Sequence, residues 1–253
     1  MLFQERVRAE SFGGVAELYD RARPSYPAAL IDALLGDGAQ RVLDVGCGTG
    51  IAGALLAERG CHVLGVEVDE RMAVLARARG LEVEVAPFER WDARGRRFDL
   101  VTCAQAWHWI DPEIGVARAA AVLDSGARIA LFWNFADPPA PLAERLALAY
   151  ARLEPDLGRR TVLLGNREDR AEPAVARLAS AGEFETAEKR SFRWQRRYDT
   201  AGWLEQVRTH SDHQTLPPGR RELMLHAIGE QIDALGGSFE MPYRTVLVRA
   251  RRR

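Results

Sequence analysis

The chain has 253 residues, enough for one large α/β domain or for a domain with a modest appendage. Apolar residues make up 47% and charged residues 28%, which are ordinary values for a globular protein. The formal net charge of −1 gives no electrostatic reason to expect a nucleic acid or an anionic membrane as a partner.

Cysteine usage and hydropathy indicate the cellular compartment in which the protein is expected. Cys47, Cys61 and Cys103 are odd in number and lack a C-x-x-C spacing, so they predict a reducing environment, no disulfide framework and no metal site. The first residues contain no apolar signal segment, and no run is long enough to span a membrane. We therefore expect a soluble, cytoplasmic protein, and the sequence leaves its oligomeric state open.

The first half of the chain alternates strand and helix patterns. A helix is expected to open at Pro27 and to end at Gly36. The following strands are expected at 41–45, 62–67, 81–86, 98–103 and 127–134, with helices at 51–59, 70–79 and 114–123. This alternation predicts βαβ units, right-handed crossovers and a parallel sheet.

The rhythm changes at a proline cluster, Ala136-Asp137-Pro138-Pro139-Ala140-Pro141. We expect residues 136–182 and 199–236 to form helical cap insertions. Segments 183–198 and 237–253 are expected to hold strands, the first from Phe184 to Trp194, that complete the same sheet as an antiparallel hairpin.

A glycine-rich loop after the first expected strand allows two interpretations. Gly48–Gly53 is a literal G-x-G-x-x-G, the fingerprint of dinucleotide binding, whereas Gly46–Gly50 is a different loop preceded by Asp44. A carboxylate at Asp44 would disfavour a pyrophosphate and favour a cationic ligand such as a sulfonium. Glu67, at the end of the second strand, suits the ribose hydroxyls of either ligand.

The motifs resemble those of class I S-adenosylmethionine-dependent methyltransferases. Val42–Gly50 resembles the first motif of that family, and 63–67 resembles its acidic motif. Residues 98–109 resemble the fourth-strand motif of the small-molecule branch that holds trans-aconitate and ubiquinone/menaquinone methyltransferases. Residues 12–20 and 23–27 resemble the entrance segment of that branch.

The resemblance implies a fold and a cofactor. It implies an α/β, Rossmann-like sheet of seven strands, mostly parallel with a final antiparallel strand, with helices on both faces and a helical cap. Residues 1–135 would form the cofactor-binding core with N-terminal entrance helices. S-adenosyl-L-methionine would be the cofactor and S-adenosyl-L-homocysteine the product.

The resemblance also implies the cofactor-binding residues. Asp44, Gly46 and Gly48 would line the methionine end, Glu67 would bind the ribose, Phe88 and Glu89 would flank the adenine, and Ala104 and Gln105 would lie beneath the sulfonium and amino group. The further cofactor-binding residues would be Cys47, Val68 and Met72. Tyr19 and Arg23 would either anchor the entrance helix or close over the methionine carboxylate. Pro87 departs from the family, because it stands where relatives often have an acid.

Three histidines are further candidates, one of them within the fourth-strand motif. His108 leaves the carboxyl end of the fourth strand between two tryptophans, so we predict that it contacts substrate or acts as a general base; a core role is the alternative. His210 and His213 have a spacing that metal ligands use, but no cysteine or carboxylate constellation completes a site. A solvated helix end is the expected role of this pair.

We therefore expect a methyltransferase that moves a methyl group to a small-molecule acceptor by in-line displacement. A carboxylate acceptor would need no base, whereas a phenol or an activated carbon would use His108. The alternatives are an NAD-dependent oxidoreductase and a non-catalytic S-adenosylmethionine-binding module. The sequence does not indicate the acceptor.

Overall fold

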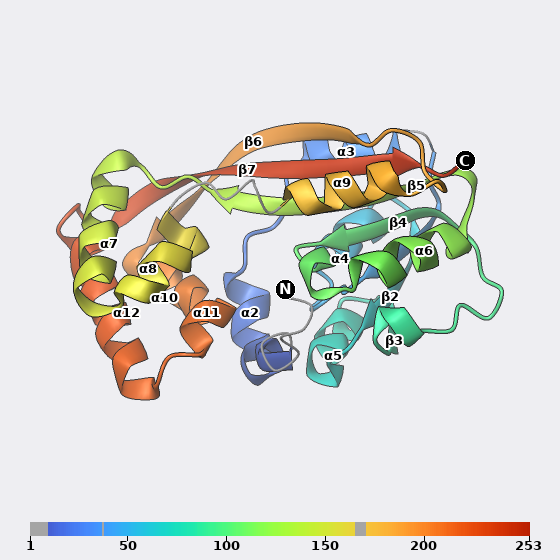
Figure 1. The fold of residues 1–253 in the computed structure, drawn as a ribbon. Coiled ribbons are helices and arrows are strands. Elements are labelled where there is room, and N and C mark those ends of the chain that lie inside the picture. The colour runs from blue at the N-terminus through green and yellow to red at the C-terminus, as the bar shows by residue number, and fades with distance from the viewer. Residues whose placement is uncertain (1–9, 37, 165–170) are drawn as a thin grey trace.

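The computed structural model describes residues 10–36, 38–164 and 171–253. Its strands form one sheet with the order β3-β2-β1-β4-β5-β7-β6 (Figure 1). The strands are β1 (Arg41–Val45), β2 (His62–Glu67), β3 (Glu82–Val85), β4 (Phe98–Ala104), β5 (Leu123–Ala136), β6 (Glu188–Asp199) and β7 (Ser238–Arg251).

Strand direction confirms the predicted sheet. β1 pairs in parallel with β2 and β4, β2 with β3, and β4 with β5. β7 runs antiparallel to both of its neighbours, β5 and β6. The strand order reverses between β1 and β4, and ligands of open α/β sheets bind at the carboxyl ends of the strands beside such a reversal.

Helices precede and separate the strands along the chain. They are α2 (Ala16–Ala22), α3 (Ala28–Leu35), α4 (Ile51–Ala57), α5 (Glu70–Ala78), α6 (Pro112–Val122), α7 (Ala140–Leu153), α8 (Pro155–Arg160), α9 (Glu172–Ser180), α10 (Thr200–Arg208), α11 (Ser211–Gln214) and α12 (Pro218–Asp233). Short 3-10 helices are η2 (Glu10–Val15), η3 (Phe88–Arg90), η4 (Trp107–Trp109) and η5 (Val162–Leu164). No helix of the described residues is both long and apolar enough to cross a membrane.

Aspartate side chains fix the beginnings of several helices. Asp69, Asp111 and Asp199 precede α5, α6 and α10, and each accepts a hydrogen bond from a backbone N–H in the first turn. Such caps satisfy amides that have no partner inside the helix. The chain therefore leaves β2 and enters α5 at a defined position beside the cavity described below.

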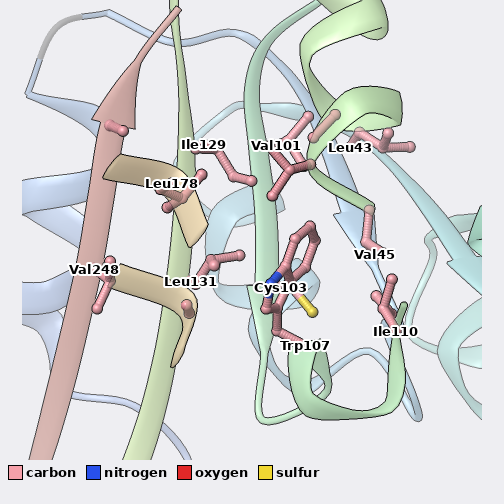
Figure 2. Packing of buried hydrophobic residues seen from close by; sticks show 14 of the residues in the cluster. Leu43, Val45, Val101, Cys103, Trp107, Ile110, Ile129, Leu131, Leu178 and Val248 are labelled. Carbon is pink, nitrogen blue, oxygen red and sulfur yellow. The ribbon is translucent and has the colours of Figure 1, made fainter. Parts of the chain in front are cut away.

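Helices cover both faces of the sheet, as predicted. α3, α4 and α5 pack on one face, where Leu30, Leu56 and Ala76 meet Val42 and Leu100. α6 and α9 cover the other face. Figure 2 shows that cluster, in which Leu178 of α9 and Val248 of β7 lie near Ile129 and Leu131 of β5, and Trp107 and Ile110 close its lower edge.

A second core belongs to a helical cap. α7, α8, α10 and α12 gather around the far ends of β6 and β7 (Figure 1), and their buried side chains include Tyr150, Trp203 and Ile228. Met241 and Tyr243 of β7 join the same cluster. The cap is therefore built on extensions of the sheet strands.

The structure differs from two predicted boundaries. α9 falls within the expected cap segment 136–182, but Ala174 and Leu178 pack on the sheet. A helix has the same apolar period in either place, so the sequence pattern does not distinguish them. β6 begins at Glu188 and not at Phe184, which makes only an isolated bridge to Arg252.

Candidate active site

A cavity of about 250 Å³ lies where the parallel strands end. Its walls come from the carboxyl ends of β1, β2, β4 and β5, the segments that follow β1 to β4, the end of α2, η5 and the residues at the start of α11. Predicted site residues that line it are Tyr19, Arg23, Gly46, Gly48, Glu67, Val68, Met72, Phe88, Glu89, Ala104, Gln105 and His108. Segments far apart in the chain thus meet at one opening.

The glycine loop follows β1 in a conformation that glycine favours. Gly46, Gly48 and Gly50 have φ angles of 63°, 57° and 82°. A Cβ on Gly46 would lie 2.6 Å from the Cβ of Ala106, so there is no room for a side chain. These positions need glycine because both the backbone angle and the close approach exclude other residues.

Glu67 connects this loop to the cavity. Its side chain is buried, and Oε2 accepts a hydrogen bond from Gly48 N at 2.8 Å. Oε1 accepts from the backbone N–H groups of Val68 and Asp69 at 2.9 and 3.0 Å. Burial raises the pKa of the Glu67 carboxyl, while the three amides oppose that rise. The carboxylate is thus held rigidly and keeps acceptor capacity for hydroxyl groups.

Asp44 lies elsewhere than predicted. Its side chain is fully buried, does not line the cavity, and accepts a hydrogen bond from Thr102 Oγ1 at 2.9 Å. Burial raises the pKa of the Asp44 carboxyl to about 7. Alternation along β1 places Asp44 on the α3–α5 face with Val42, whereas Val45 lines the cavity. This corrects the prediction that the Asp44 carboxylate faces a cationic ligand.

Cys47 also lies apart from the main cavity. Its side chain is buried and packs so close to β2 that a Cβ on Gly65 would be 2.6 Å from the sulfur. It lines a smaller neighbouring cavity of about 40 Å³. The Cys47 side chain therefore packs beneath the loop, and its place at the cofactor stays a prediction.

Arg23 reaches the cavity from the entrance helix α2. Its Nη2 donates to the carbonyl oxygen of Thr209 at 2.9 Å, and its guanidinium carbon lies 4.8 Å from the centre of the Tyr19 ring. Its Nε is buried and has no hydrogen-bond acceptor among the described residues. A buried donor of this kind suits a carboxylate ligand.

The end of β4 carries backbone strain at the cavity. Gln105 has a φ of 59° although it has a side chain, and its N–H donates to Phe132 O at 2.9 Å. Such conformations cost free energy and gather at functional sites. Nearby, Glu89 accepts a hydrogen bond from Asp111 N, which orients its carboxylate at the cavity rim.

The pair His210 and His213 is not the solvated helix end that we predicted. His210 is 9% exposed and lines the cavity, and His213 is 0% exposed. The His213 ring is hydrogen-bonded to Tyr150 Oη at 2.7 Å and to Asp212 Oδ1 at 2.8 Å. Within the described part of the chain, no cluster of at least three His, Cys, Asp or Glu side chains could hold a metal ion.

Several lining residues were not among the predicted site residues. From the end of β5 come Trp133, Asn134 and Phe135, from η4 Trp109, from η5 Val162, and from the cap His210 and Ser211. The β5 residues follow the rule that places sites at the carboxyl ends of parallel strands. The cap residues carry no signal of that kind, because folding alone brings them to the cavity.

Known proteins similar in sequence are methyltransferases. Residues 42–126 match the model of a family described as a methyltransferase domain. An uncharacterized methyltransferase of Mycobacterium tuberculosis is 33% identical over 257 aligned residues that cover 99% of each chain. A ubiquinone biosynthesis O-methyltransferase of Hahella chejuensis is 40% identical over 96 residues, covering 35% of this chain and 40% of that protein.

Solved structures share the fold. A structure of a candidate type II methyltransferase from Anaeromyxobacter dehalogenans has a TM-score of 0.65 and 24% identity, covering 90% of this chain and 97% of that one. Haemonchus contortus phosphoethanolamine N-methyltransferase 2, solved with phosphomonomethylethanolamine and S-adenosylhomocysteine, has a TM-score of 0.51 at 15% identity, covering 99% of this chain and 59% of that one. These identities establish the fold alone.

The strand order and the glycine loop at the reversal of the sheet define the class I methyltransferase fold. The full-length similarity adds the family, and the chain belongs to the S-adenosylmethionine-dependent methyltransferases.

Proposed function

We propose that this protein transfers a methyl group from S-adenosylmethionine to a small-molecule acceptor. The observation that carries the proposal is that one cavity joins Arg23, whose buried Nε has no acceptor among the described residues, to Glu67, whose carboxylate ends β2 and is bonded to Gly48 of the glycine loop. A carboxylate in this position suits the two ribose hydroxyls of an adenosine. When bound, S-adenosylmethionine would supply an electrophilic methyl group on a positively charged sulfur.

The lining residues fit such a cofactor. Glu67 would hold the ribose, and the unpartnered Nε of Arg23 would donate to the methionine carboxylate. Phe88, Pro87 and Met72 offer apolar contact for the adenosine. Tyr19, Gly46, Gly48, Val68, Glu89, Ala104 and Gln105 complete the proposed contacts.

The chain's own contribution to the reaction would be alignment and the exclusion of water. A displacement needs nucleophile, methyl carbon and sulfur in line, and a walled cavity maintains that arrangement. Aromatic side chains in the wall would exclude water, which suits a transition state in which the positive charge of the sulfur is dispersed. Residues of the cap, the entrance helix and the sheet line one cavity, so the cofactor and the acceptor would lie next to each other in it.

Calorimetry with S-adenosylmethionine and with NAD tests the cofactor. We expect the wild-type protein to bind S-adenosylmethionine, and Glu67→Gln to weaken that binding by about tenfold or more because a charge-assisted acceptor is lost. Glu70→Gln, at a largely exposed side chain on α5, is the matched control. Binding of NAD in place of S-adenosylmethionine would support the oxidoreductase alternative and overturn the proposal.

Turnover separates an enzyme from a binding module. Labelled S-adenosylmethionine is incubated with the protein and with small-molecule or macromolecular fractions of a cell extract. We expect label to move into the small-molecule fraction with release of S-adenosylhomocysteine. Label in the macromolecular fraction alone would contradict a small-molecule acceptor, and binding without transfer would support the non-catalytic module.

A further inference from the structure

Part of the cavity wall lies outside the proposed cofactor contacts. We call it the acceptor wall, and it consists of His108, Trp109, Trp133, Asn134, Phe135, Val162, His210 and Ser211. The strand order places the end of β5 on the side of the sheet away from β2, which ends at Glu67, and from β3, which Phe88 follows. A second ligand beside the cofactor would therefore contact this wall.

The acceptor wall is aromatic and carries no acid and no lysine or arginine. Trp109, Trp133, Phe135 and Val162 offer flat apolar surface. Among the described residues that line the cavity, Arg23 is the one side chain with a permanent positive charge, and it also lines the small cavity beside the glycine loop. A planar, uncharged molecule matches such a wall better than a carboxylate or an ammonium group.

The wall also offers polar groups to an oxygen atom. The indole Nε1 of Trp133 is buried and has no hydrogen-bond acceptor among the described residues. Buried indole N–H groups ordinarily have a partner. His210, Ser211 and Asn134 add three more polar side chains. An aromatic ligand with a hydroxyl group would use both the apolar surface and these groups.

His210 has the surroundings of a proton acceptor. Its ring centre lies 6.3 Å from that of His213, whose ring is hydrogen-bonded to the Asp212 carboxylate. Burial favours the neutral Asp212 carboxyl, but the hydrogen bond from His213 and the charges of His213 and His210 hold its pKa below the ordinary range. Asp212 therefore stays ionised, and its negative charge favours a protonated His210.

Other groups near His210 bring charges of both signs or stay neutral. Arg23 donates to the carbonyl of Thr209, the residue before His210, and its positive charge opposes protonation of His210. Tyr150 is hydrogen-bonded to His213 and stays neutral, because burial raises the pKa of its hydroxyl well above the ordinary value. Asp212 is largely buried, and the charges of both histidines lower the pKa of its carboxyl, so it is a negative group that interacts with both rings.

We propose that the acceptor is an uncharged aromatic alcohol and that His210 of the cap takes its hydroxyl proton. The inference rests on the proposed methyl transfer. The hydroxyl oxygen forms a bond to the methyl carbon, the carbon–sulfur bond breaks with its electron pair remaining on sulfur, and the proton passes to His210 and then to solvent. His210 is a catalytic residue in this scheme, and the Asp212 carboxylate stabilises the positive charge that His210 gains.

The test uses 4-nitrophenol, which absorbs visible light only when ionised. It is titrated with wild-type protein saturated with S-adenosylhomocysteine, at a pH where most of the free phenol is neutral. We expect the bound phenol to show an about tenfold larger ionised fraction than the free phenol, because proton transfer to His210 leaves the phenolate. His210→Gln should bind the phenol without the visible band, and the matched control His226→Gln, at an exposed histidine of α12, should keep it.

Three results would overturn the inference. They are the absence of the visible band with the wild-type protein, a visible band that persists in His210→Gln whether or not His108→Gln loses it, or tighter binding of 4-nitrobenzoate than of 4-nitrophenol to the wild-type protein. The last comparison needs no variant, so it tests whether the acceptor is an uncharged aromatic alcohol even if His210→Gln does not fold. Calorimetry with S-adenosylhomocysteine is performed first, since failure there concerns the proposed function and not His210.

Discussion

The buried carboxyl of Asp44 shows how a residue near a site can act on stability and not on the ligand. It lies wholly inside the protein against Thr102, and burial raises its pKa from 3.8 to about 7. The folded state therefore holds this proton over a range in which the unfolded chain releases it. Its contribution to stability is present below the unfolded pKa and is lost as the pH rises through about 7.

Asp44→Asn removes this titration and retains an acceptor for Thr102. We expect the variant to gain stability relative to the wild type as the pH rises from about 4 to about 7, by a few kcal/mol, because the wild type must ionise a buried group. Urea denaturation of both proteins across that range measures the difference. Asp137→Asn, at an exposed position after β5, should show none. Parallel stability profiles of wild type and Asp44→Asn would contradict the raised pKa.

Gly46 tests whether the loop needs space as well as a left-handed backbone. In Gly46→Ala the new Cβ would lie 2.6 Å from Ala106, at a φ of 63°. Gly60→Ala also has a positive φ, 87°, but nothing lies within 4 Å of its Cβ. We expect Gly60→Ala to cost about 1–2 kcal/mol from the backbone alone, and Gly46→Ala to cost about 1–3 kcal/mol more. Equal free energies of unfolding in urea would contradict the close approach.

At the scale of elements, β6 and β7 connect the sheet to the cap. β7 supplies Val246 and Val248 to the core of the sheet and Met241 and Tyr243 to the cap cluster. Arg21 pairs with Glu205, so α2 is also tied to α10 by an ion pair. The cap is thus a continuation of the sheet, and its helices are held at the cavity by strands that are themselves part of the core.

Trp203 of α10 is the test of cap packing. It is fully buried, and its ring meets Tyr198 and Phe239 edge-on at centroid distances of 5.1 and 5.4 Å. We expect Trp203→Ala to lose about 3–5 kcal/mol of stability, since it leaves a large cavity. Leu148→Ala, at a position of α7 that is 72% exposed, should change stability by less than about 0.5 kcal/mol. Chemical denaturation measures both, and a similar small effect at Trp203 would contradict the packed cap.

At the scale of the whole molecule, the shared strands predict one cooperative unit. An added domain on a flexible linker would unfold separately, but β7 cannot leave the cap without disturbing its pairing with β5. Hydrogen bonds from Arg196 to the carbonyl oxygens of Ala22 and Arg23 further join β6 to the entrance helix. The elements that line the cavity are therefore joined in one packed unit.

Scanning calorimetry tests this cooperativity. We expect a single transition whose calorimetric and van't Hoff enthalpies agree, because the sheet core and the cap core share β6 and β7. Saturating S-adenosylhomocysteine should raise the transition temperature as one peak, since it binds only the folded state. Two separate transitions, with only one shifted by the ligand, would show that cap and sheet unfold independently.

The local patterns of the sequence were enough to predict the sheet. Short buried runs separated by helical periods predicted β1 to β5, and the glycine loop with Glu67 marked the carboxyl end where the cavity lies. These features are local: alternation, apolar period and positive φ depend on a few neighbouring residues. For the same reason, the motifs located most of the cavity lining supplied by the first four strands.

Only the tertiary structure decided which way Asp44 points and which residues of the cap reach the cavity. The first depends on which face of the sheet each side chain of β1 takes, and alternation alone does not say which face holds the ligand. The second depends on long-range packing: His210 meets the cavity because α10 and α11 dock beside α2 through contacts distant in sequence. Sequence by itself therefore determined the strand ends and the glycine loop that line the cavity, and the packing of the cap determined which of the cap residues join them.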